Sequence, residues 1–307
     1  RVAHPGRTGR ARPGGIGGGR ERGRVDAVKL AFSPGPNDTF VFHAWVHGLI
    51  EGATRTEITY ADIDVTNTAA ERGEFDVVKV SYAALPWLLE QYTLLPAGGA
   101  LGRGCGPLVL TRGDVSSLDG RTVAVPSERS TAYLLFRLWA AGQRPARIEV
   151  VPFTQIMPAV RDGRYDAGLV IHEARFTYPT YGLSALADLG EWWESDTGLP
   201  IPLGAILARR ELDTGTLTSV GRVAVERAWA DPSASAAYVA EHADEMSPAV
   251  QAQHIALYVN EFTRDLGDEG YAAVDALLTR AHAHALVPKI DLGRIRDASR
   301  LSAKARS

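Results

Sequence analysis

The chain has 307 residues, of which 45% are apolar and 22% are charged, and its formal net charge at pH 7 is −3. This composition is typical of a globular protein large enough for two domains, and the slightly negative charge disfavours nucleic acid as the main partner. The single cysteine, Cys105, excludes an internal disulfide and a cysteine metal cluster. No apolar run in the sequence reaches the length that spans a membrane.

The amino-terminal segment differs from the rest of the chain. Residues 1–24 contain seven arginines, one glutamate and a glycine-rich tract, so their net charge is +6. A secretory signal peptide needs an apolar segment after its basic residues, and this stretch has none. We therefore expect residues 1–26 to be a disordered tail outside the fold. An arm that binds nucleic acid is the less favoured alternative.

From Val28 onward, predicted strands and helices alternate. Short apolar runs between turn residues predict strands, and apolar residues at helical spacing predict helices. The predicted strands are 28–32, 56–60, 75–80, 108–111, 121–125, 148–152, 167–171 and 204–208. The predicted helices are 39–50, 66–72, 83–91, 132–141 and 155–162, and the chain is almost wholly helical from Leu217. Such alternation favours parallel α/β sheets, with 198–204 as a crossing linker between two sets of elements.

The glycine-rich segment 98–107 is predicted to be a turn. It contains Gly102-x-Gly104-x-Gly106, but a predicted strand follows these glycines, whereas a helix follows the glycines of a dinucleotide fingerprint. The sequence also lacks a Walker-type loop. A nucleotide cofactor is therefore not expected.

Two predicted helices begin with residues suited to capping. Asn37 or Asp38 is a good N-cap for the first helix, and Ser130 or Thr131 for helix 132–141. The free amides at such a helix start attract anions, so the second start predicts a cradle for a carboxylate.

His43 and His47 stand four residues apart on the first predicted helix, a spacing that lets two histidines share a metal ion. A third ligand is missing from the pattern. We therefore interpret them as ordinary helical histidines and predict no metal site.

Four polar residues follow predicted strands: Ser33, Ser81, Ser127 and His172. Ligands of doubly wound sheets bind at the carboxyl ends of the strands, so these side chains should converge on one cleft. His172 follows the apolar run 167–171, and histidine is suited to take a proton near neutral pH. A turn serine or a loop histidine is the ordinary interpretation of each residue alone. The four together favour a site.

Several stretches of the chain resemble the 1,4-dihydroxy-6-naphthoate synthase family of the futalosine route to menaquinone. They are Ser33–Phe40 followed by His47-Gly48, Asp76–Leu85, Gly102–Leu108 and Ile171–Tyr178, within a resemblance that covers about residues 27–285. Gly35 departs from the family, which often has cysteine there, and a turn tolerates either residue.

The resemblance implies a periplasmic-binding-protein-like fold of type II. This fold has two α/β lobes, each a mixed, mostly parallel sheet flanked by helices, with a cleft between them. Lobe 1 would comprise residues 27–110 and 205–307, and lobe 2 residues 111–204. The two crossings would lie near residues 108–112 and 202–206.

The resemblance also implies a cytoplasmic carbon–carbon lyase without a metal or nucleotide cofactor. It would convert cyclic dehypoxanthine futalosine to 1,4-dihydroxy-6-naphthoate and release a three-carbon fragment. His172 matches the family's general base, which would deprotonate a sugar-derived hydroxyl before a retro-aldol type cleavage and aromatisation. Asp38 is the next candidate for the base. The candidates for substrate binding are Ser33, Asn37, Lys79, Ser81, Ser127, Ser130 and Thr131.

The small-molecule substrate is the expected partner, without nucleic acid or stable membrane association, and a homodimer is left open. Two alternatives share the fold. A non-catalytic solute-binding protein would carry a signal peptide or a lipoprotein cysteine, whereas Cys105 lies far inside the chain. The chorismate dehydratase of the same pathway matches the stretches 33–40 and 171–178 less well.

Overall fold

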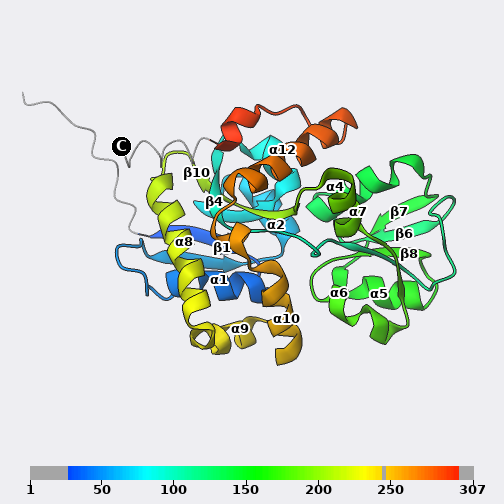
Figure 1. The fold of residues 1–307 in the computed structure, drawn as a ribbon, viewed down its shortest axis with the longest axis horizontal. Coiled ribbons are helices and arrows are strands. Elements are labelled where there is room, and N and C mark those ends of the chain that lie inside the picture. Colours follow the sequence, from blue (N-terminus) through cyan, green and yellow to red (C-terminus); the bar gives the residue numbers. More distant parts are fainter. Residues whose placement is uncertain (1–26, 244–246, 297–307) are drawn as a thin grey trace, which may run out of the picture.

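The computed structural model describes residues 27–243 and 247–296, and the predicted tail of residues 1–26 lies outside these ranges. The described chain forms two lobes side by side, each built on a five-stranded sheet with helices on both faces (Figure 1). Mixed sheets flanked by helices confirm the predicted α/β class. Among the described residues, no helix combines the length and apolar character needed to cross a membrane.

Lobe 1 contains the first sheet, with strand order β2-β1-β3-β10-β4. Strand β1 pairs in parallel with β2 and β3, and β10 runs antiparallel to β3 and β4. The strands are β1 (Val28–Phe32), β2 (Thr56–Tyr60), β3 (Val77–Ser81), β4 (Tyr92–Gly102) and β10 (Ile201–Arg209). The helices of this lobe are α1 (Pro36–Val46), α2 (Ile63–Glu71), α3 (Leu85–Leu88), α8 (Thr214–Ala230), α9 (Ala236–His242), α10 (Pro248–Tyr258), α11 (Glu261–Arg264) and α12 (Gly267–Ala283).

Lobe 2 contains the second sheet, with strand order β7-β6-β8-β5-β9. Here β6 pairs in parallel with β7 and β8, and β5 runs antiparallel to β8 and β9. The strands are β5 (Leu108–Thr111), β6 (Thr122–Val125), β7 (Arg147–Val150), β8 (Ala167–Val170) and β9 (Ser184–Asp188). The helices are α4 (Thr131–Trp139), α5 (Phe153–Arg161), α6 (Ala174–Thr177) and α7 (Leu189–Thr197).

The two sheets therefore repeat one pattern. In each, the second strand from one edge lies between two parallel neighbours, and the third strand pairs antiparallel with the fourth. By this pattern β1 corresponds to β6, and β3 corresponds to β8. Parallel strands in one sheet end at the same edge. The residues at or just after the ends of these four strands line the region between the lobes.

The chain changes sheets between β4 and β5 and again between β9 and β10. The predicted lobe boundaries, after residues 110 and 204, fall inside β5 and β10, so both crossings lie earlier in the chain than predicted. At the first crossing, a Cβ on Gly106 would lie 2.1 Å from the backbone nitrogen of Gly190. Only glycine permits this backbone contact between the crossing and the start of α7.

Two local predictions were wrong, the first because long-range pairing overrode the local signal and the second because Pro36 already suits a helix start. The glycines of segment 98–107 predicted a turn, yet β4 continues through Gly98 and Gly99 to Gly102, paired with β10. The first helix begins at Pro36 with Gly35 as its N-cap, and Asn37 and Asp38 lie in its first turn. Proline suits the first helical position, because its missing N–H would have no partner inside the helix there.

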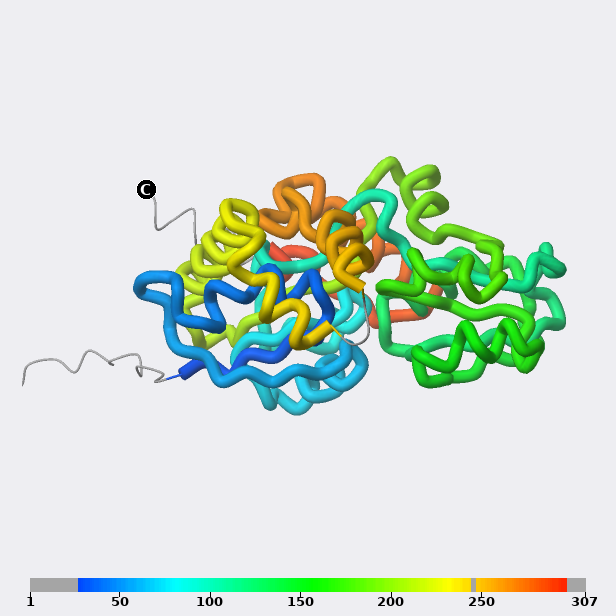
Figure 2. The backbone as a smooth tube through the Cα atoms, turned by 90° about the horizontal axis from the view of Figure 1, so that it is seen from below, coloured from blue at the N-terminus to red at the C-terminus, as the bar shows by residue number. Residues whose placement is uncertain are grey.

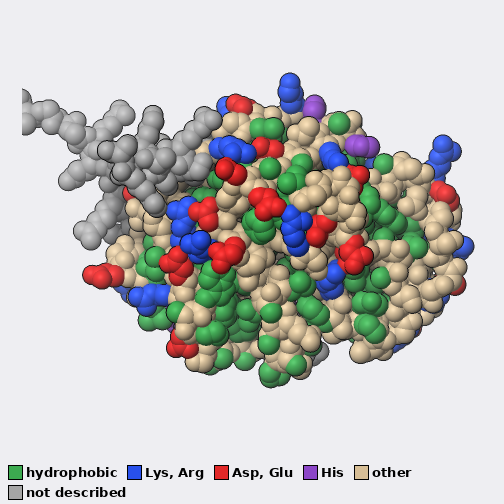
Figure 3. All heavy atoms as spheres, in the orientation of Figure 1, with side chains coloured by type: hydrophobic (Ala, Val, Ile, Leu, Met, Phe, Trp, Pro, Cys, Tyr) green, Lys and Arg blue, Asp and Glu red, His purple; other side chains and the backbone are tan. Residues whose placement is uncertain are grey.

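The lobes share a continuous packed interior. One buried cluster runs from Val78 and Leu94 of lobe 1 to Val123 and Leu135 of lobe 2. Figure 2 shows the orange-to-red C-terminal segment extending from lobe 1 towards the green lobe 2, where α12 contacts α4. This packing holds the first turn of α4 beside lobe 1. On the face seen in Figure 3, acidic and basic side chains are interspersed.

Candidate active site

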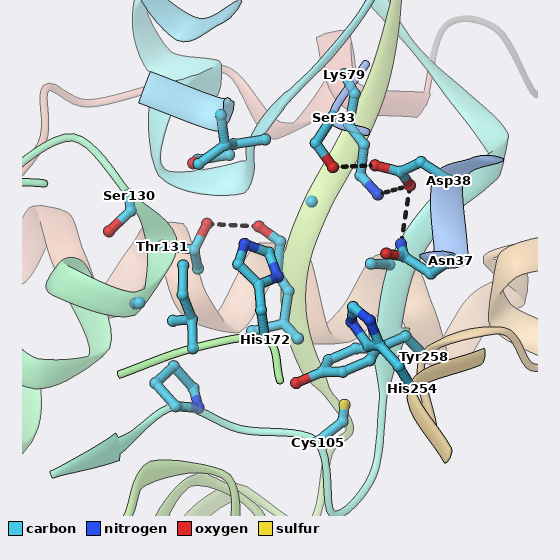
Figure 4. A pocket seen from close by; sticks show the side chains of 18 residues that line it. Ser33, Asn37, Asp38, Lys79, Cys105, Ser130, Thr131, His172, His254 and Tyr258 are labelled. Carbon is cyan, nitrogen blue, oxygen red and sulfur yellow. Dashed lines mark hydrogen bonds and ion pairs between the residues drawn. The ribbon is translucent and has the colours of Figure 1, made fainter. Parts of the chain in front are cut away.

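A cavity lies between the lobes, where strand ends of both sheets meet (Figure 4). The predicted residues that line it are Ser33, Asn37, Lys79, Ser81, Ser130, Thr131 and His172. Ser127 lines the adjoining cleft, which also contacts Ser33, Ser130 and His172. The structure thus gathers all the predicted site residues into one region.

His172 enters the cavity from the end of β8. All four residues of β8 are buried, as the apolar run predicts, and the chain then turns at Ile171 and His172. The φ angle of His172 is +54°, in the left-handed region that few non-glycine residues adopt. Such backbone conformations cluster at functional sites, where the surrounding structure holds them in place.

His172 is electrically neutral at neutral pH. Burial and, to a smaller extent, the Lys79 ammonium lower the pKa of its imidazole from the ordinary 6.5 to about 4, although Asp38 opposes the shift. Its ring lies 6.0 Å, centroid to centroid, from each of the rings of Phe153 and His254. A neutral imidazole has one nitrogen free to accept a proton, which is the property a general base needs.

The lobe 1 wall of the cavity holds a buried ion pair between Lys79 and Asp38. The Asp38 carboxylate also accepts hydrogen bonds from Ser33 Oγ and Asn37 Nδ2, each at 2.8 Å. Both carboxylate oxygens are therefore engaged, which makes Asp38 a poor alternative base. A Cβ on Gly204 would lie 2.9 Å from Lys79 Cε, so glycine there leaves room for the lysine side chain.

Ser81, the last residue of β3, is held by Asn67 of α2. The Ser81 backbone N–H donates to Asn67 Oδ1 at 2.8 Å, and Asn67 Nδ2 donates to Ser81 Oγ at 3.1 Å. This arrangement leaves the Ser81 hydroxyl proton available to a ligand in the cavity. Sequence analysis missed Asn67, because its role depends on a contact between α2 and β3 that no local pattern signals.

The start of α4 supplies the lobe 2 wall. Ser130 is the N-cap, as one of the two predicted alternatives, and its hydroxyl accepts from the backbone N–H of Tyr133 at 3.1 Å. The Thr131 hydroxyl instead bridges to lobe 1, donating to the Leu203 carbonyl at 2.7 Å and accepting from the Ala83 N–H at 3.2 Å. Its proton is already used, so an anion at this helix start would meet first-turn amides, which have no acceptor within the helix.

Among the lining residues that sequence analysis did not select as site residues, three have titratable side chains: Cys105, His254 and Tyr258. His254 and Tyr258 stand one turn apart on α10, with their rings 4.6 Å apart. Burial raises the pKa of the Cys105 thiol to about 12, so this thiol stays protonated. His43 and His47 lie elsewhere, with rings 4.5 Å apart, and within residues 27–243 and 247–296 no third residue completes a metal-binding group.

Comparison with known proteins assigns the family. A profile described as menaquinone biosynthesis matches residues 28–283. This chain belongs to the menaquinone biosynthesis family. Its relative from Streptomyces coelicolor, named 1,4-dihydroxy-6-naphtoate synthase, is 64% identical over 272 residues, which cover 87% of this chain and 96% of the relative.

Solved structures support the periplasmic-binding-protein-like fold of this family member. A protein of Archaeoglobus fulgidus superimposes with a TM-score of 0.81 at 31% identity, covering 86% of this chain and all of that one. The ligand-binding component of an ABC-type import system from Staphylococcus aureus gives a TM-score of 0.63 at 14% identity, over 90% of this chain and all of that one. At such low identity the second likeness concerns the fold alone.

Proposed function

We propose that this member of the menaquinone biosynthesis family is a 1,4-dihydroxy-6-naphthoate synthase, a lyase that cleaves a carbon–carbon bond of cyclic dehypoxanthine futalosine. The observation that carries the proposal is His172, a neutral imidazole held in the cavity between the lobes. The relative with 64% identity bears the name of this enzyme. The substrate is a small molecule, and a cavity between two lobes is a usual place for a small-molecule site.

In the proposed reaction His172 accepts the proton of a sugar-derived hydroxyl. As the O–H bond breaks, that oxygen forms a carbonyl with its carbon, and the adjacent carbon–carbon bond breaks. The bonding electron pair moves to the ring fragment, where a conjugated oxygen carries the charge until it is protonated. Aromatisation then drives the release of the three-carbon fragment. The protein has to position, deprotonate and exclude water, and both lobes contribute to these tasks.

The polar groups on the cavity wall have proposed roles in binding. The first-turn amides of α4, next to Ser130 and Thr131, would receive the substrate carboxylate. The Ser81 hydroxyl has a proton to donate, and Asn37 and Ser33 face the cavity beside the Lys79–Asp38 pair. Ser127 would contact the substrate at the open side of the cleft.

The proposed reaction balances without an oxidant, so it requires no redox cofactor. A cytoplasmic location is part of the proposal. The free thiol of Cys105 is compatible with a reducing compartment.

Incubating the purified protein with cyclic dehypoxanthine futalosine tests the proposal. We expect 1,4-dihydroxy-6-naphthoate and a three-carbon product to form in equal amounts by mass spectrometry, with or without a chelator. Binding of the compound without turnover would instead indicate a solute-binding protein. Consumption of chorismate in a parallel reaction would indicate the dehydratase of the same pathway.

A further inference from the structure

His254 is a buried histidine whose ring nitrogens make no hydrogen bond to any residue that the structure describes. It lies on α10 in lobe 1, and its side chain is 1% exposed. Within the described part of the chain, neither Nδ1 nor Nε2 has a hydrogen-bond partner. Buried polar groups in folded proteins are nearly always hydrogen-bonded, and leaving one unsatisfied is costly. A histidine in this position therefore points to a partner that enters the cavity.

The surroundings of His254 place its ring opposite His172. The two rings are 6.0 Å apart and nearly perpendicular, at 65°, and they come from different lobes (Figure 4). The Tyr258 ring also packs against His254, edge to face. The turn before α1 also lies close, since a Cβ on Gly35 would be 4.0 Å from His254 Cε1. These contacts hold the ring at the edge of the space that a substrate would occupy.

His254 is suited to donate a hydrogen bond rather than to carry charge. Burial, with smaller contributions from His172 and the Lys79 ammonium, lowers the pKa of its imidazole to about 3. The ring is therefore neutral at neutral pH, with one N–H donor. Where water is excluded, a buried neutral donor stabilises an oxygen on which negative charge develops, because little water competes for that oxygen.

We propose that His254 contacts the substrate and donates its ring N–H to the oxygen that takes up negative charge after His172 removes the proton. The inference rests on the proposed function and assigns the two imidazoles complementary roles. His172 accepts a proton from one substrate oxygen. His254 holds a second oxygen by a hydrogen bond, and its own proton stays on the ring.

Three variants test this role by turnover of cyclic dehypoxanthine futalosine. His254→Phe keeps a flat ring of similar size without a donor, and we expect kcat to fall about a hundred- to a thousandfold, the scale of a lost oxyanion donor. His254→Gln restores an N–H donor and should bring kcat back to roughly a tenth or more of the wild-type value. His47→Asn, which removes a histidine outside the cavity, is the control and should match the wild type.

The outcomes separate the inference from the proposed function. If the wild type makes no naphthoate, both fail. If the wild type is active and His254→Phe keeps kcat within about threefold, only the role of His254 fails. The role also fails if His254→Gln is as slow as His254→Phe, because the ring would then serve packing.

A binding measurement on the wild type covers the case in which His254→Phe does not fold. Protein labelled with ¹⁵N in its histidines is titrated with 1,4-dihydroxy-6-naphthoate, and the His254 ring signals are assigned by their loss in His254→Gln. We expect the His254 N–H signal to shift on binding while the His47 signals stay in place. Saturating ligand that leaves the His254 signals unchanged would overturn the inference.

Discussion

Ser81 and His172 stand at equivalent positions in the two lobes, at or just after the ends of β3 and β8. Around Ser81 the polar groups bind one another: Asn67 holds Ser81, and the Asp38 carboxylate is engaged by Lys79 and two further donors. His172 instead extends into the cavity from a left-handed backbone with a strongly lowered pKa.

This difference shows that one sheet topology can supply two kinds of wall to the same cavity. Lobe 1 contributes a prearranged network of hydrogen bonds around a buried ion pair. Lobe 2 contributes a reactive imidazole and a helix start. The topology decides where the side chains converge, and the residue at each strand end decides the chemistry there.

Substitutions at the two corresponding strand ends should have unequal effects on turnover. His172→Asn keeps a side chain that tolerates the left-handed backbone but cannot accept a proton, so we expect turnover to fall about a hundred- to ten-thousandfold. Ser81→Ala should cost less than about tenfold, the scale of one hydrogen bond. Steady-state kinetics on both variants checks this. Comparable losses in the two, or nearly full turnover in His172→Asn, would contradict the contrast.

The ion pair of lobe 1 should contribute mainly to stability. Asp38→Asn leaves the Lys79 ammonium buried and uncompensated, so we expect the free energy of unfolding in urea to fall by about 3–5 kcal/mol. Adding Lys79→Met removes the unpaired charge and should recover part of that loss. His172→Asn is the matched comparison in lobe 2 and should unfold near the wild-type urea midpoint. A stable Asp38→Asn variant would show that the pair is dispensable.

The pH dependence should report the environment of His172. Its uncharged form is active and its pKa is lowered to about 4, so kcat/KM should stay level through pH 6.5 and decline only as pH approaches 4. Because the unfolded chain binds this proton at higher pH, stability should also decrease as pH falls from 6.5 towards 4. A kcat/KM profile recorded above and below these values checks the first point. An acid limb near pH 6.5 would mean that the imidazole is solvated.

The smallest effect is expected at the contact between the lobes. Thr131→Ala removes the hydroxyl that joins Leu203 and Ala83, so the start of α4 should be held less firmly beside lobe 1. We expect KM to rise by a factor of several, the scale of one or two lost hydrogen bonds. Thr131→Ser keeps the hydroxyl and serves as the control. An unchanged KM in Thr131→Ala would remove this bridge from any role in binding.

The sequence by itself determined the elements whose signals are local. Apolar runs bounded by turn residues identified β1, β2 and β8, and the capping residue Ser130 marked the start of α4. Polar residues after successive strands predicted a shared cleft, because strand order constrains where carboxyl ends meet. Four of the eight predicted site residues, namely Ser33, Ser81, Ser127 and His172, followed from this regularity.

Only the tertiary structure decided the features that depend on distant partners. The glycines of β4 indicated a turn, whereas pairing with β10 places them in a strand. The lobe boundaries differ from the predicted ones because the whole of β5 belongs to the sheet of lobe 2 and the whole of β10 to the sheet of lobe 1. His254 carries no local signal, since it is a histidine on an ordinary helix until α10 packs its ring against the cavity. A residue's role there depends on what surrounds it in space, and burial and the neighbouring charges arise only when both lobes fold together.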